Sequence, residues 1–207
     1  MGTDIHTFIE YDDHRSRGSF SGQPEEPALL FGKFSVWRDY ALFDALGDGR
    51  NSLMDPEDIG KMDPEGIGRR SLYPPRGIPA DISWETAREY YELVVEAQTP
   101  HAGFWPRYGC VSVSEAAERV RHGAHLGHVA QTIHYGTTPP RTWQAVSKEY
   151  WHTPSWLSLV EIHQSLEHHR LSPTDLRWDF RAVLNSLVEV EKETGPGQAR
   201  LVFWFDK

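Results

Sequence analysis

An aspartate and a histidine lie two residues apart at the beginning of the chain, in the segment MGTDIHTFIEY. Side chains of an extended strand alternate between its two faces, so Asp4 and His6 would share one face. Phe8 and Glu10 follow on that face, and the opposite face would carry Ile5, Thr7, Ile9 and Tyr11. A carboxylate and an imidazole side by side can bind a metal ion or transfer a proton. We therefore expect Asp4 and His6 to face a pocket rather than water, with Phe8 as its floor.

A third group, His152, could complete a metal site. Asp4, His6 and His152 would supply one carboxylate and two imidazoles, a set that suits zinc, manganese or iron with positions left open for water or substrate. Such a metal lowers the pKa of its bound water, which would make the protein a phosphoesterase-like hydrolase with a divalent metal cofactor. The simpler alternative is that Asp4 caps a turn and His6 donates a hydrogen bond to a buried carbonyl group.

Arginines beside glycines and helix starts predict a second chemistry, the binding of an anion. Arg38 lies in RDYALF and Arg76 in RGIPADIS, and a guanidinium group can clamp a phosphate or carboxylate with two hydrogen bonds. Tryptophan rings could stack on a base or sugar. The candidate ligand-binding residues are Arg38, Asp39, Tyr40, Arg76, Asp81, Ser155 and Trp156. Alternatively, the two arginines brace the long loop through carbonyl groups and ion pairs with Asp39 or Asp81, which requires no ligand.

Other motifs carry less weight. HGAHLGH spaces His122, His125 and His128 three residues apart, which on a helix would bring His122 and His125 together as metal ligands. Its two glycines disfavour a regular helix, however, and a chain with 11 histidines produces such spacing by chance. Cys110 precedes an expected helix start, where a thiolate is favoured, yet lone cysteines usually only pack. The chain has no P-loop, dinucleotide fingerprint or G-x-S-x-G motif, so covalent catalysis is the weakest hypothesis.

The composition limits the class of protein. The 207 residues carry a formal net charge of −9, and an acidic surface repels the phosphates of a nucleic-acid polymer. No apolar run reaches the ~18 residues of a membrane span, and the N-terminus lacks a signal-peptide pattern. A single cysteine fits a reducing compartment. We expect a cytoplasmic protein that binds neither a nucleic-acid polymer nor a membrane.

Hydrophobic patterns and capping signals predict one α+β domain over residues 1–207. Strands are expected at 3–11, 28–37 and 200–206, and helices at 39–46, 83–98, 112–122, 153–169 and 172–194. The expected N-caps of these helices are Asp39, Ser83, Ser112, Thr153 and Ser172. The two apolar terminal strands should lie side by side in a mixed or antiparallel sheet packed by several helices. Three segments lack a regular period: 12–27, a loop or mobile hairpin arm; 48–82, a long ordered functional loop; and 122–142, an irregular stretch.

Five segments carry a resemblance to a family of small proteins found in bacteriophages and in bacterial genomes with phage genes. They are MGTDIH, RDYALF, RGIPADIS, HTPSWLSL and LVFWFD. Members of that family similarly begin M-G-C/T-D-I-H, carry R-x-Y-x-L-F, R-G-L-P-x-D-V-S and H-S-H-S-W-L-T-L, and end in an aromatic-rich strand. The resemblance implies a phage-type accessory protein and assigns no catalytic residue.

Two functional hypotheses follow. The first is a protein that binds a small phosphorylated or nucleotide-like molecule; the resemblance extends it to the sequestration of a host immune signal. The second is the metal-dependent hydrolase with Asp4, His6 and His152. We prefer binding, because the sequence shows no complete set of metal ligands. A pure protein–protein inhibitor fits the acidic surface but leaves Asp4 and His6 unexplained. The closing strand suits a homo-oligomer interface as well as a core.

Overall fold

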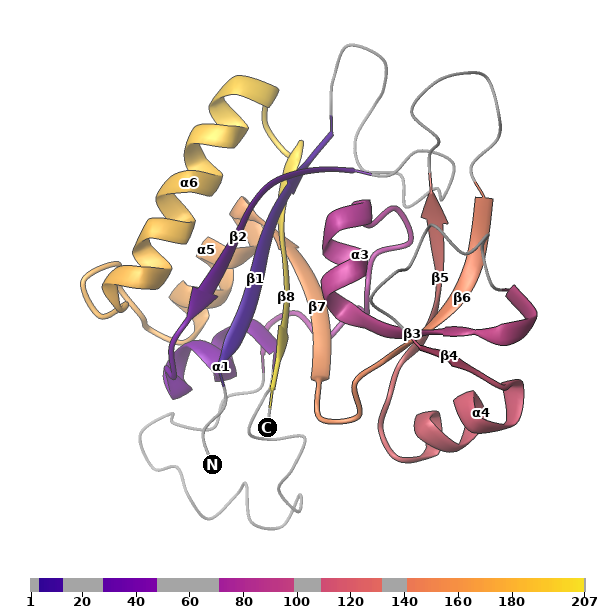
Figure 1. Ribbon diagram of the computed structural model, residues 1–207. Helices are drawn as coiled ribbons and strands as arrows, with labels where there is room; N and C mark the ends of the chain where they lie inside the picture. The colour runs from indigo at the N-terminus through magenta and orange to yellow at the C-terminus, as the bar shows by residue number, and fades with distance from the viewer. Residues whose placement is uncertain (1–3, 13–27, 48–70, 99–108, 132–140, 207) are drawn as a thin grey trace, which may run out of the picture.

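A computed structural model describes residues 4–12, 28–47, 71–98, 109–131 and 141–206 (Figure 1). Its strands are β1 (Ile5–Tyr11), β2 (Leu29–Val36), β3 (Tyr91–Val95), β4 (Cys110–Val111), β5 (Leu126–Gln131), β6 (Arg141–Ser147), β7 (His152–Ser158) and β8 (Ala199–Phe205). Its helices are α1 (Tyr40–Gly47), α3 (Trp84–Tyr90), α4 (Val113–Arg121), α5 (Leu159–His168) and α6 (Trp178–Thr194), with a 3₁₀ turn, η2 (Glu96–Gln98). None of these helices is long and apolar enough to span a membrane.

The first sheet joins both ends of the chain. Its order is β2-β1-β8-β7 with antiparallel neighbours, and β1 opposes β8 from the pair Ile5 and Phe205 to the pair Tyr11 and Ala199. Every residue of β8 is buried, because this strand has a neighbour on each side and packed layers on both faces. The predicted pairing of the terminal strands is therefore confirmed.

The two faces of this sheet belong to different cores. Ile5 and Ile9 pack with buried residues of α1, α5 and α6, whereas Phe8 packs with residues of α3 and of the second sheet. In Figure 1, α5 and α6 lie on one side of the sheet and α3 on the other. This arrangement confirms the period-two alternation expected for the first strand.

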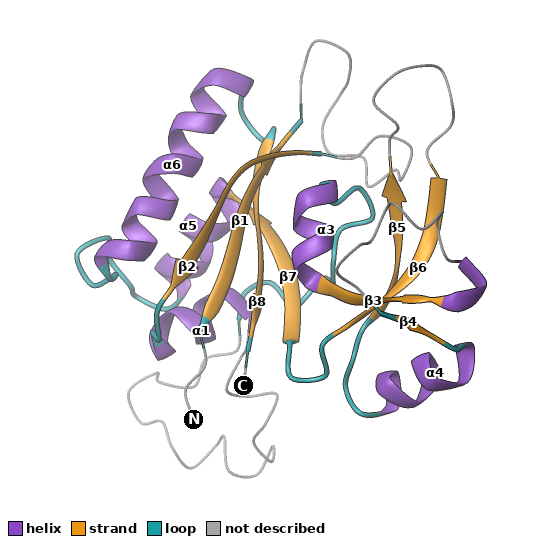
Figure 2. Ribbon diagram, viewed as in Figure 1, coloured by secondary structure: helices purple, strands orange, loops and turns teal. Residues whose placement is uncertain are grey.

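The second sheet has the order β4-β3-β6-β5, with β3 and β4 parallel and the other pairs antiparallel (Figure 2). A small apolar cluster that includes Ala116 joins α4 to β3, β4 and β6. With one antiparallel and one mixed sheet packed by helices, the fold is α+β, as predicted.

The helix predicted over 83–98 is confirmed in its first half and wrong in its second half. Ser83 caps α3, because its hydroxyl accepts a hydrogen bond from the backbone N–H of Thr86. The helix ends at Tyr90, however, and Tyr91–Val95 continues as β3. Three of its five residues, Tyr91, Val94 and Val95, favour strands, and its pairing with β6 outweighs the helical period. The segment 122–142, expected to be irregular, contains β5 and the start of β6.

Both predicted helix starts in the C-terminal part are wrong. Thr153 and Pro154 lie in β7, and α5 begins after Ser158, which forms a reciprocal capping box with Glu161. The capping box satisfies two backbone N–H groups at once, which the predicted cap at Thr153 could not. Ser172 and Asp175 form a turn, and α6 begins only at Trp178.

Two predicted loops fall mainly outside the described residues. Of the segment 12–27, residues 13–27 are not described, and of the segment 48–82, residues 48–70 are not described. Residues 71–82 carry no long element and pass from α1 toward the second core. Ser71 donates a hydrogen bond to the carbonyl of Ala45 at one end, and Ile82 packs in the second core at the other.

Candidate functional site

His6 is held by a carboxylate that the sequence did not suggest. Its Nε2 atom lies 3.2 Å from Oδ2 of Asp206, and Oδ1 of Asp206 accepts a hydrogen bond of 2.7 Å from the backbone N–H of Asp4. The imidazole ring also lies against Trp151 and Trp204, with centroids 5.5 and 5.8 Å away. The register of β1 and β8 would have indicated this partner, because it places residue 206 opposite residue 4.

The three predicted metal ligands are not brought together. His152 opposes Phe205, which also opposes Ile5, so its side chain belongs to the face of the sheet that carries Ile5. Its ring accordingly contacts the ring of Phe205, at 5.7 Å. His6 follows Ile5 in β1, so its side chain points to the opposite face of the sheet from those of Ile5 and His152. In the described ranges, no group of three or more His, Cys, Asp or Glu residues is placed to hold a metal ion.

The predicted ligand-binding residues fall into separate groups. Asp39 caps α1, with Oδ1 accepting a hydrogen bond of 3.1 Å from the backbone N–H of Leu42. Arg38 and Tyr40 are exposed beside it. Arg76, Ser155 and Trp156 come together elsewhere: the backbone N–H of Arg76 donates to the hydroxyl of Ser155, and its guanidinium group lies 4.7 Å from the ring centre of Trp156.

Arg76 acts as a brace in this arrangement. Its guanidinium group donates to both carboxylate oxygens of Glu161 and to the carbonyl of Trp156. Burial alone would raise the pKa of Glu161, but hydrogen bonds from Arg76 and Ser158 hold that pKa below its ordinary value. The bracing interpretation of Arg76 therefore matches the geometry, although the partner is Glu161 and not Asp39 or Asp81.

Asp81 belongs to a buried ion network with the C-terminal strand. Arg200, only 1% exposed, donates hydrogen bonds of 2.7 Å to Oδ1 of Asp81 and 2.7 Å to Oε2 of Glu10. The other oxygen of Glu10 accepts from the backbone N–H of Ser83. A guanidinium group with two carboxylates and further backbone partners has its charge and its hydrogen bonds satisfied inside the protein. This network fixes one end of the segment 76–83, and Arg76 fixes the other.

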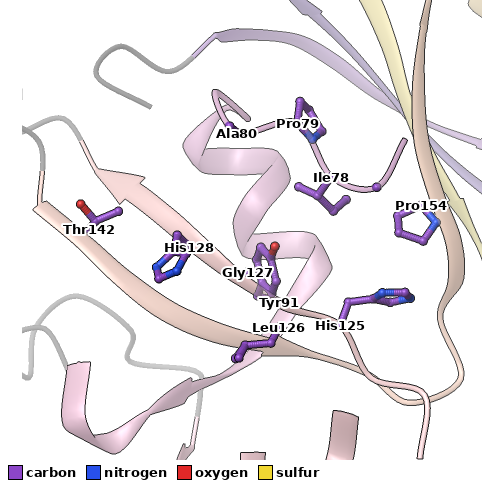
Figure 3. A pocket seen from close by; sticks show the side chains of 11 residues that line it. Ile78, Pro79, Ala80, Tyr91, His125, Leu126, Gly127, His128, Thr142 and Pro154 are labelled. Atoms are coloured by element: carbon purple, nitrogen blue, oxygen red, sulfur yellow. The ribbon is translucent and has the colours of Figure 1, made fainter. Parts of the chain in front are cut away.

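Residues 77–80, between these two anchors, form one wall of a pocket of about 500 Å³. Figure 3 shows the opposite wall, where Leu126, Gly127 and His128 of β5 follow His125. Gly77 has φ 78°, which favours glycine, and its N–H donates to the carbonyl of Pro154 at the pocket edge. The wall is therefore tied to β7 by its backbone.

The lining of the pocket is mainly apolar, with a few polar groups: His125, His128, the hydroxyl of Tyr91 and the hydroxyl of Thr142. Burial lowers the pKa of His125 and raises that of Tyr91, so both are uncharged at neutral pH. None of the described lining residues is Lys, Arg, Asp or Glu. The described lining thus offers hydrogen-bonding groups but no Lys, Arg, Asp or Glu side chain that could pair with a charged group of a ligand.

Tyr91 reaches into the pocket because residue 127 has no side chain. A Cβ atom built on Gly127 would lie 1.9 Å from the hydroxyl oxygen of Tyr91 and 2.7 Å from its Cζ atom. The phenol tip therefore rests directly on the backbone of β5. Tyr91 and Gly127 were not identified as site residues from the sequence. The signal that could have found them is the glycine inside strand β5, because glycine in a strand often marks a close approach by another group.

The pocket lies beside residues that the sequence indicated, but those residues do not line it. The candidate ligand-binding residues of RGIPADIS were Arg76 and Asp81, whereas residues 77–80 between them form the pocket wall. His125 and His128 were considered only as metal ligands. Comparisons of the chain with protein-family models, with curated proteins and with solved structures find no match. The function is therefore argued from the geometry of the pocket.

Proposed function

We propose that the protein binds a small nucleotide-like molecule and that the uncharged heterocycle of this ligand occupies the pocket between residues 77–80 and β5. The observation that carries the proposal is a mainly apolar pocket of about 500 Å³ that has hydrogen-bonding groups and no Lys, Arg, Asp or Glu among its described lining residues. Pockets for small ligands typically have such a size and such a lining.

The polar groups match the edge of a heterocyclic base. A neutral imidazole has one nitrogen that donates and one that accepts, so His125 can pair with either kind of group. The hydroxyls of Tyr91 and Thr142 can do the same. Ile78 and Pro79 offer apolar contact from the opposite wall, which a flat ring would cover. Hydrogen bonds inside an apolar pocket discriminate well between ligands, because an unpaired buried group is costly.

A phosphate group would have to lie outside this lining. The guanidinium group of Arg76, which precedes the lining residue Gly77, is engaged by Glu161. A phosphorylated ligand would therefore place its base in the pocket and its phosphate toward solvent. The resemblance to phage-associated proteins extends this proposal to the capture of a signalling nucleotide from the host.

The anchored wall supports binding by a preformed pocket. Arg76 holds one end of the segment and Asp81 the other, so little conformational freedom remains to be lost when a ligand enters. For the metal-dependent hydrolase, the described residues offer no comparable support, because His6 and His152 lie on opposite faces of the first sheet.

A thermal-shift panel of nucleosides and their monophosphates would test the proposal. A nucleoside at about a hundred times its Kd should add about 2.7 kcal/mol to the free energy of unfolding, and its monophosphate should bind no more tightly. His125→Ala and His128→Ala should weaken binding, whereas His163→Ala, an exposed histidine of α5, should leave it unchanged. Stabilisation by no member of the panel, or equal binding by all three variants, would contradict the proposal.

A further inference from the structure

β5 is an outer strand of the second sheet. Among the described strands it pairs only with β6, in an unbroken register from Leu126 opposite Val146 to Gln131 opposite Arg141. One of its two edges therefore has no strand partner in the part of the chain that the structure describes. The backbone N–H and C=O groups along such an edge are available to another molecule.

The register shows which backbone groups point outward from this edge. The N–H of Ser147 in β6 donates a hydrogen bond of 3.0 Å to the carbonyl of His125, so this carbonyl points toward β6. The N–H and C=O of one strand residue point to the same side, and those of the next residue point to the other side. The backbone groups of Leu126 and His128 therefore point away from β6, whereas those of Gly127 point toward it.

The pocket lies along this edge and not over one face of the sheet. Side chains alternate between the two faces of a strand, yet three successive residues, Leu126, Gly127 and His128, line the same pocket. Successive residues are accessible together only from the edge of a strand. Figure 3 shows residues 77–80 on the other side of the space. The outward backbone groups of Leu126 and His128 therefore belong to the lining.

Tyr91 adds a polar group at the same point. This residue is only 3% exposed, and it lines the pocket with its hydroxyl against the backbone of Gly127. No other described residue forms a hydrogen bond with this hydroxyl. A buried hydroxyl without a partner is costly, and a polar group of a ligand would remove that cost.

We propose that the free edge of β5 binds the Watson–Crick edge of the heterocycle, with the carbonyl of Leu126 accepting a hydrogen bond from the base and the N–H of His128 donating one to it. This carbonyl and this N–H are neighbouring outward groups on either side of Gly127. A nucleobase carries a donor beside an acceptor on its Watson–Crick edge, through which proteins read an unpaired base. The inference rests on the proposed function, because it names the atoms that bind the heterocycle.

The short accessible length of the edge favours a small heterocycle over a peptide. A peptide strand added to a sheet forms hydrogen bonds along several successive residues. Only Leu126, Gly127 and His128 of β5 line the pocket, and its volume of about 500 Å³ suits a small ligand. A single flat ring can use the two outward groups, whereas a peptide strand would need a longer free edge.

Nucleosides with a blocked Watson–Crick edge test the inference on the wild-type chain. Isothermal titration calorimetry would compare adenosine with N6,N6-dimethyladenosine, inosine with 1-methylinosine, and uridine with 3-methyluridine. In each pair, methylation removes the donor of that edge and should lower affinity about tenfold or more, because the carbonyl of Leu126 would lose its partner. The 2′-O-methyl forms of the three parents carry the methyl group on the ribose and should bind as the parents do.

A substitution at His128 tests the backbone donor. Proline has no N–H, and a strand accepts it where that N–H would point away from the neighbouring strand. His128→Pro should bind the parent nucleosides about fivefold or more weakly than His128→Ala, which also loses the imidazole but keeps the N–H. Circular dichroism would verify that both variants fold.

Two results would overturn this inference and leave the proposed function standing. One is that methylated nucleosides bind as tightly as their parents, and the other is that His128→Pro and His128→Ala bind equally. No binding by any of the three parents would overturn both the inference and the proposed function. If His128→Pro does not fold, the nucleoside pairs with the wild-type chain decide the result.

Discussion

Arg200 and Asp81 form an ion pair of 2.7 Å that fastens the C-terminal strand to the segment carrying the pocket wall. The pair is buried, and Arg200 forms a second ion pair with Glu10 on the neighbouring strand. The wall therefore depends on residues near both ends of the chain, none of which lines the pocket. A site built in this way remains in place without a ligand, and its stability can be tested separately from its function.

Replacing Arg200 by Met should lower the free energy of unfolding by about 3–5 kcal/mol, because Glu10 and Asp81 would stay buried without their counter-charge. Urea denaturation measures the change. Arg121→Met, which removes an exposed arginine, should alter stability by about 0.5 kcal/mol or less. A loss below about 1 kcal/mol in Arg200→Met would contradict a stabilising role for the network.

The pKa of Glu161 lies below its ordinary value of 4.5 in the folded protein. A carboxyl group with a depressed folded pKa contributes stability above its unfolded pKa and loses that contribution as the pH falls through the folded pKa. We expect wild type to be more stable than Glu161→Gln at neutral pH, and the two to converge as the pH falls below 4.5. Denaturant titrations at several pH values measure this. A difference between the two proteins that is constant over this range would contradict the Arg76 brace.

Burial lowers the pKa of His125 from 6.5, so the folded protein favours the neutral ring. A group of this kind contributes stability above the unfolded pKa, and the contribution is lost as the pH falls toward the folded value. Wild type should therefore lose stability below pH 6.5 more steeply than His125→Gln. Thermal unfolding across this range provides the measurement, with His163→Gln as the exposed control. Parallel curves for wild type and His125→Gln would show that the ring is not desolvated.

Gly127→Ala should fill the space that the Tyr91 hydroxyl occupies, because the added methyl would lie 1.9 Å from that oxygen. Overpacking of this kind costs about 1–3 kcal/mol, and the displaced ring should also reduce ligand binding. Adding Tyr91→Phe should restore part of the stability, since the nearest remaining contact is the ring carbon at 2.7 Å. Differential scanning calorimetry of the single and double variants gives the result. A fully additive double variant would mean that residues 91 and 127 do not touch.

Local signals predicted the elements that local interactions stabilise. The caps at Asp39, Ser83 and Ser112 were correct, because each hydroxyl or carboxylate satisfies a backbone N–H within three residues. The segments 91–95 and 126–131 were misassigned, since both are strands because they pair with β6, and this pairing is not visible in either segment alone. The hydrophobic pattern of a single segment carries no information on the strand with which it will pair.

For the candidate site, the sequence indicated the segment that carries the pocket wall but not the residues that hold this segment in place. RGIPADIS drew attention to the pocket wall because polar residues, glycine and proline cluster there. Asp206 and Arg200 were missed, because they meet His6 and Glu10 only through the pairing of strands about 190 residues apart. The binding roles of Arg38, Arg76 and the other candidate residues stay predictions.

The central claim is that the pocket between residues 77–80 and β5 takes an uncharged heterocycle. Titration of ¹⁵N-labelled protein with the nucleoside that gives the largest thermal shift tests it most directly, because glycine amides are well separated in the spectrum. We predict saturable shifts of the Gly77 and Gly127 amide signals, with Gly195, at the end of α6, unchanged. Shifts confined to other parts of the chain, or no shifts with any nucleoside, would contradict the assignment of this pocket as the binding site.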